Sequence, residues 1–88
     1  MVINKQAVCG TLQSNDCFVR ITPGEGEGIM LHIESTVKET FGKQIEETIM
    51  KKLENMGVES CSLYIEDKGA LDYTIRARVE TAVKRADE

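Results

Sequence analysis

Hydrophobic and polar residues alternate along the first quarter of the chain, which indicates β-strands. The alternation covers residues 7–12 and 17–22, with a short polar break between them. Period-two alternation on both sides of a short break is typical of a β-hairpin. Asn15 suits the positive φ that a tight turn requires. A two-residue turn at Ser14 and Asn15 predicts a register that gathers the aliphatic side chains on one face, with the opposed pairs Leu12–Cys17, Gly10–Val19 and Val8–Ile21.

The next segment reads as a loop, a third strand and a long helix. Residues 22–28 contain one proline and three glycines, a loop composition. Residues 29–34 alternate again and predict a strand. Thr36 followed three residues later by Glu39 fits a capping box with Thr36 as the N-cap. The helix that follows should end at Gly57, and its apolar stripe consists of Val37, Phe41, Ile45, Ile49, Leu53 and Met56.

A fourth strand and a second helix complete the pattern. Residues 58–67 predict a strand that points Cys61, Leu63 and Ile65 inward, and the helix after it has the stripe Leu71, Ile75, Val79, Ala82 or Val83, and Ala86. The order βββαβα predicts an α+β fold of two layers, a four-stranded sheet with both helices packed on one face. The β–α–β segment should form a right-handed parallel crossover. The predicted core contains Leu12, Val19, Ile21, Phe41, Ile45, Ile49, Leu63, Ile75 and Val79.

Composition narrows the class of protein. A chain of 88 residues has room for one domain, which we assign to residues 1–88. The net charge of −4, the absence of Trp and the low aromatic content argue against a nucleic-acid partner. No apolar run is long enough for a bilayer, and the N-terminus lacks the apolar stretch of a signal peptide. We therefore expect no membrane partner. Three cysteines without CxxC spacing argue against disulfides and a zinc site, so we expect reduced thiols in a cytoplasmic protein.

No catalytic or metal-binding constellation is visible. The only histidine, His32, falls on the polar face of its strand, and the glycine-rich loop lacks the Lys-Ser/Thr of a phosphate-binding loop. The cysteines have no neighbouring base, and Asp16, Glu66 and Asp67 are most simply solvated acids. Ser14 remains: a hairpin-tip hydroxyl without a base is a poor nucleophile for turnover, but a good attachment point for a modifying enzyme that supplies the base.

Two segments resemble the signatures of a known family. Residues 7–16, AVCGTLQSND, followed by Val19-Arg20-Ile21, resemble the N-terminal signature of the citrate lyase acyl carrier protein, the gamma subunit. Residues 67–72, DKGALD, followed by residues 75–80, IRARVE, resemble its second signature. The resemblance extends from about residue 1 to 85, and length, acidic balance and element order agree with it. The Asp-Ser-Leu tripeptide of four-helix acyl carriers does not occur.

The resemblance implies a role for Ser14. In this family the serine at this position is esterified through a phosphodiester by 2'-(5''-phosphoribosyl)-3'-dephospho-CoA, an arm whose terminal thiol carries acetyl or citryl groups. A prosthetic-group transferase attaches the arm. The alpha subunit exchanges acetyl for citrate, and the beta subunit cleaves the citryl thioester to oxaloacetate. The resemblance thus implies a non-catalytic carrier subunit, and the negative charge makes Asp16 our first candidate for a docking residue.

Two other functions compete with this interpretation. The same carrier could serve a related lyase such as citramalate lyase, since partner subunits choose the substrate. A small scaffold or regulatory module without a prosthetic group would use Ser14 only as a turn residue. A stand-alone hydrolase is disfavoured, because neither a triad nor a set of metal ligands is visible.

Overall fold

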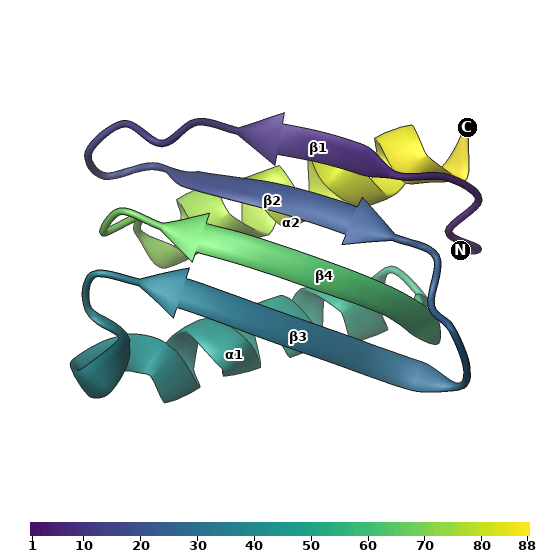
Figure 1. The fold of residues 1–88 in the computed structure, drawn as a ribbon, viewed down its shortest axis with the longest axis horizontal. Helices are drawn as coiled ribbons and strands as arrows, with labels where there is room; N and C mark the ends of the chain where they lie inside the picture. The colour runs from purple at the N-terminus through teal and green to yellow at the C-terminus, as the bar shows by residue number, and fades with distance from the viewer.

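Four strands form one mixed sheet, and both helices cover the same face of it (Figure 1). The computed structural model describes all residues from 1 to 88. The elements are β1 (Ala7–Gly10), β2 (Cys17–Thr22), β3 (Gly28–Ser35), α1 (Lys38–Asn55), β4 (Ser60–Asp67) and α2 (Asp72–Asp87). The predicted α+β class, the order βββαβα and the packing of both helices on one face are confirmed.

The strand order β1-β2-β4-β3 places the fourth strand inside the sheet. β4 pairs antiparallel with β2 and parallel with β3, and β1 pairs antiparallel with β2. Helix α1 therefore connects two adjacent parallel strands, as predicted for the β–α–β segment. Because β4 pairs with a strand on each side, its ends fix the start of the β4–α2 loop and the end of the α1–β4 loop.

One hydrophobic core lies between the sheet and the helices. Seven of the nine predicted core residues are buried: Val19, Ile21, Ile45, Ile49, Leu63, Ile75 and Val79. The predictions for Leu12 and Phe41 are wrong, since these side chains are 55% and 48% exposed. Both positions continue an apolar pattern beyond the end of the sheet, where no strand or helix covers them. All three cysteines are buried, and none is bonded to another.

The predicted hairpin register is wrong by one residue. Cys9, rather than Gly10, pairs with Val19, so the side chain of Val8 is 40% exposed and that of Cys9 is buried. The cause lies at Gly10, whose φ of +105° ends β1 before the turn. A Cβ at this position would collide with the Cys17 carbonyl. The connection is therefore the six-residue segment 11–16 instead of a two-residue turn.

Helix α1 begins later than the capping box predicted. Its N-cap is Val37, without a side-chain cap, so the assignment of Thr36 is wrong. The Thr36 N–H instead donates to the Asp67 carbonyl at 3.4 Å, which continues the β3–β4 pairing. The predicted end of the helix is confirmed, because Gly57 has a φ of +71° that suits a C-terminal stop. Neither helix has the length and apolar character needed to cross a bilayer.

Candidate functional site

Ser14 lies at an exposed turn of the β1–β2 connection, as the sequence predicted. The Asp16 N–H donates to the Gln13 carbonyl at 3.1 Å, so Ser14 and Asn15 are the central residues of a β-turn. Asn15 has a φ of +66°, which confirms the predicted backbone conformation. The Ser14 hydroxyl thus stands in solvent on a turn of defined shape.

The turn is attached to the loop between β4 and α2. The Asn15 N–H donates to the Lys68 carbonyl at 2.8 Å, and the Lys68 N–H donates to the Asp16 carbonyl at 2.9 Å. These two hydrogen bonds extend the β2–β4 pairing beyond Cys17 and Asp67. The backbone beside Ser14 is consequently held by the inner strand of the sheet, which limits the movement of a long hairpin connection.

Asp16 joins this turn to helix α2. Its carboxylate accepts hydrogen bonds from Arg78 Nε at 3.0 Å and Arg78 Nη2 at 2.9 Å, a bidentate ion pair. It also accepts the Thr11 hydroxyl at 2.6 Å and the Cys17 N–H at 2.7 Å. We call Asp16, Arg78 and Thr11 the turn clamp. It ties both ends of the segment that carries Ser14 to α2.

The turn clamp sets the charge beside Ser14. The hydrogen bonds from Arg78, and to a smaller extent those from Thr11 and Cys17, together lower the pKa of Asp16 from its ordinary 3.8 to about 2, against the raising effect of partial burial. Asp16 raises the pKa of Arg78 in turn. Both groups are therefore charged at neutral pH and compensate each other, so Asp16 does not present a free negative charge next to Ser14.

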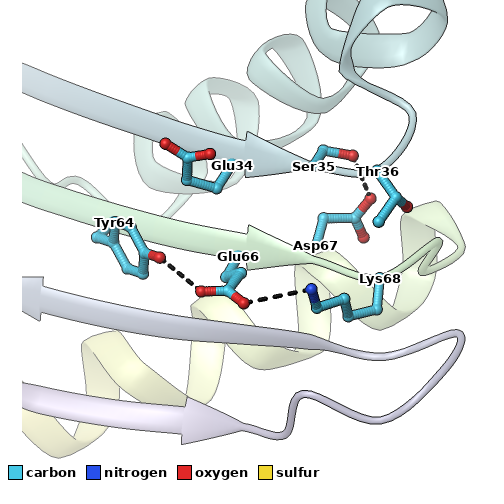
Figure 2. Close-up of a pocket in the computed structure, with 7 residues that line it drawn as sticks. All are labelled: Glu34, Ser35, Thr36, Tyr64, Glu66, Asp67 and Lys68. Atoms are coloured by element: carbon cyan, nitrogen blue, oxygen red, sulfur yellow. Dashed lines mark hydrogen bonds and ion pairs between the residues drawn. The ribbon is translucent and has the colours of Figure 1, made fainter.

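A polar cleft of about 430 Å³ opens at the end of β3 and β4 (Figure 2). Its walls are Glu34, Ser35, Thr36, Tyr64, Glu66, Asp67 and Lys68. The Tyr64 hydroxyl donates to Glu66 at 2.7 Å, and Lys68 Nζ lies 3.4 Å from the same carboxylate. The Glu66 carboxylate raises the pKa of Tyr64, while the hydrogen bond from Tyr64 lowers the pKa of Glu66. Three carboxylates against one lysine make this cleft unsuitable for a phosphate group.

The prediction that Asp16, Glu66 and Asp67 are solvated acids is wrong for Asp16 and Asp67. Asp67 is 1% exposed, where it accepts the Ser35 hydroxyl at 2.8 Å and the Ala70 N–H at 2.8 Å. Asp16 is held in the turn clamp, with its side chain 15% exposed. Both carboxylates therefore shape the loops around Ser14. Sequence reasoning missed Arg78 as well, because it lies 62 residues from Asp16 and nothing in its local pattern marks the pair.

The other sequence candidates lie away from the Ser14 turn or are buried. His32 is exposed on the open face of the sheet, bonded to Glu34 at 2.9 Å and stacked on Tyr64 at 5.5 Å. The glycine-rich loop connects β2 and β3 at the opposite end of the sheet (Figure 1). Burial raises the pKa of the Cys17 thiol to about 12 and that of Cys61 to about 11. Apart from Cys17, whose backbone N–H donates to Asp16, none of these residues is hydrogen-bonded to the Ser14 turn.

Comparison with known proteins first defines the class. The sequence model of a family described as ACP, malonate decarboxylase delta subunit (MdcD), matches residues 4–86. A chain of a Pseudomonas malonate decarboxylase hetero-tetramer, crystallised with malonate, has a similar fold, with a TM-score of 0.79 over 96% of this chain and 86% of that one. At 19% identity, this likeness concerns the fold alone. The class is that of small acyl carriers built on a mixed sheet.

Two relatives of known name identify the branch of this class. A citrate lyase acyl carrier protein of Treponema denticola is 54% identical over all of this chain and 99% of its own length. One of Fusobacterium nucleatum is 43% identical over all of this chain and 94% of its own length. The chain belongs to the family of citrate lyase acyl carrier proteins, and its role is that of an acyl carrier rather than a catalyst.

Proposed function

We propose that the chain is the carrier subunit of a citrate lyase and that Ser14 is the attachment site of its prosthetic arm. The observation that supports this proposal is the exposed hydroxyl of Ser14 on a turn fixed by the Asn15–Lys68 hydrogen bond and the turn clamp. A phosphodiester needs an accessible hydroxyl, and a carboxylate that is paired with a cation repels it less than a free carboxylate does. The Asp16–Arg78 ion pair provides this compensation.

The arm we propose is 2'-(5''-phosphoribosyl)-3'-dephospho-CoA, whose terminal thiol carries acetyl or citryl groups as thioesters. Ser14 Oγ attacks the phosphorus of a polyphosphate-activated precursor of the arm, so that the new O–P bond forms as the phosphoanhydride bond breaks and pyrophosphate leaves. The transferase removes the hydroxyl proton, since this chain offers no base at the turn. The turn clamp holds the serine at a constant place while the alpha and beta subunits act in succession. Tethering keeps the acyl group at high effective concentration for both subunits. We expect the carrier to act in the cytoplasm.

An intact-mass measurement tests this proposal. The chain is co-expressed with the transferase and its activated arm precursor, alongside Ser14→Ala and Ser14→Thr. We expect the wild-type chain to gain the mass of the arm, Ser14→Ala to gain none, and Ser14→Thr to be modified slowly because its methyl group crowds the attack. Ser14→Ala should fold normally, since surface substitutions usually change stability by less than about 0.5 kcal/mol. Full modification of Ser14→Ala would place the attachment elsewhere.

Reconstitution separates this function from its competitors. A complex of the loaded chain with the alpha and beta subunits should cleave citrate, whereas the complex with Ser14→Ala should not. Cleavage of citramalate in place of citrate would favour the related lyase. A wild-type chain that takes up no arm from a competent transferase would favour a scaffold without a prosthetic group.

A further inference from the structure

An apolar groove adjoins the Ser14 turn between the first turns of the two helices. Its volume is about 460 Å³, and its apolar lining residues are Val37, Phe41, Ile45, Ala70, Leu71 and Tyr73. Three of these side chains are largely exposed: Phe41 by 48%, Leu71 by 58% and Tyr73 by 64%. The stripes of α1 and α2 run beyond the end of the sheet here, so nothing in the chain covers them.

The groove is continuous with the proposed attachment site. Lys68, whose backbone bonds Asn15 and Asp16, is followed directly by the groove residues Gly69 and Ala70. A Cβ placed on Gly69 would lie 3.7 Å from Asn15 Oδ1, so the wall of the groove lies next to the Ser14 turn. An arm attached at Ser14 would start from this end of the molecule, where the hairpin connection and the β4–α2 loop lie together (Figure 1).

The charges around the groove define the chemistry of its partner. The acidic lining residues are Asp67 and Asp72, and no basic residue lines the groove. Asp67 is buried, whereas Asp72 is bonded only by the neutral Gln44 amide, at 3.2 and 3.4 Å. A partner that buries an apolar side chain in the groove therefore gains from a lysine or arginine that reaches Asp72.

We propose that this groove is the docking surface for the partner subunits, which insert an apolar side chain flanked by a basic residue. The proposal rests on the proposed carrier function and adds the surface by which the carrier is recognised. It also replaces Asp16 as the docking acid. Both carboxylate oxygens of Asp16 are engaged by Arg78, whereas Asp72 lines the groove and has no ion-pair partner.

Binding measurements with the chain lacking its arm test the groove separately from Ser14 chemistry. The affinities of the alpha and beta subunits of citrate lyase for the wild-type carrier are compared with those of Phe41→Ser and Leu71→Ser. We expect each substitution to weaken binding of at least one subunit tenfold or more, because buried anchor residues dominate interface affinity. Phe41→Leu, which keeps an apolar side chain, should stay within about threefold.

The chain offers a matched control on its open sheet face. Met30 is 72% exposed and outside the groove, so Met30→Ser removes a comparable apolar side chain, and binding should change less than twofold. Asp72→Asn should slow association at low salt and lose this effect at high salt. Thermal unfolding of each variant checks that it folds.

The results that would exclude the groove as a docking surface differ from those that would exclude the proposed carrier function. Unchanged affinity in Phe41→Ser and Leu71→Ser, or an equal loss in Met30→Ser, would exclude the groove as the binding surface. A loss seen only with the arm attached would mean that the groove holds the arm, and a concentration-dependent dimer abolished by Leu71→Ser would mean that it holds a second copy. If the wild-type chain binds neither subunit and Ser14 takes up no arm, the proposed function itself fails. Binding that is lost in the groove variants while Ser14 still takes up the arm supports both proposals.

Discussion

The turn clamp makes a quantitative prediction about the stability of the fold. Asp16→Asn removes the negative charge and one hydrogen-bond acceptor, and it leaves the Arg78 guanidinium with a weaker partner. A pKa lowered from 3.8 to about 2 corresponds to at most about 2.5 kcal/mol, since one unit is worth about 1.4 kcal/mol. The Arg78 side chain is 35% exposed, and solvent screening reduces this value. We expect Asp16→Asn to lower the free energy of unfolding by about 1–2 kcal/mol at neutral pH.

The pH dependence gives this prediction its signature. The pKa of Asp16 is lower in the folded chain than in the unfolded one, so the stabilisation is complete above about pH 5 and disappears as the pH falls towards 2. The difference between the wild-type chain and Asp16→Asn should therefore shrink to about half at about pH 3. Urea unfolding followed by far-UV circular dichroism at several pH values measures it. Arg78→Lys keeps the charge but loses the bidentate geometry, so it should fall between the two.

A second ion pair provides the control. Glu80 lies between Lys52 at 2.6 Å and Lys84 at 3.2 Å on the helix surface, with its side chain 39% exposed. Glu80→Gln should cost less stability than Asp16→Asn, because exposed ion pairs are screened and contribute little. Equal losses in the two variants, or a loss in Asp16→Asn that does not vary with pH, would refute the assignment of the turn clamp as a structural tie.

The core and its thiols give two further predictions. Ile49→Ala should lower the free energy of unfolding, measured in urea, by about 2–5 kcal/mol, because Ile49 is fully buried. The neighbouring, partly exposed Met50 is the control, and Met50→Ala should change the free energy of unfolding by no more than about 0.5 kcal/mol. Similar losses in the two variants would contradict the core as described. Cys17 and Cys61, with pKa values raised by burial to about 12 and about 11, should resist a thiol reagent at about pH 8 until urea unfolds the chain, and rapid labelling of the folded protein would show that they are accessible.

The fold was predictable because its main signals are local and periodic. The alternation in β4 and the stripes of α1 and α2 each describe one element that packs on one side, and the buried residues Ile49, Leu63 and Ile75 follow them. The hairpin register was not predictable in the same way. A local turn rule favoured a two-residue loop, whereas the backbone bonds to Lys68 and the positive φ of Gly10 determine the longer connection.

The site was predictable only as a single residue. The hairpin pattern and the family signature both pointed to Ser14, and the structure shows that it is exposed on a turn. The residues that hold the turn come from distant segments: Lys68 precedes α2 and Arg78 lies within it. Contacts across more than fifty residues leave no period or spacing in the sequence, so the turn clamp required coordinates.

The residues that escaped the predicted core carry information of their own. Leu12 and Phe41 extend apolar patterns that, inside a sheet or beneath a helix, would be buried. Both occur at the end of the molecule where the Ser14 turn meets the β4–α2 loop. An isolated domain gains no stability from exposed apolar side chains, and these side chains promote association. Disagreement between a strong local pattern and the observed burial is expected at functional or strained sites. The same disagreement therefore singles out the neighbourhood of Ser14 and the entrance of the groove, independently of any resemblance to known carriers.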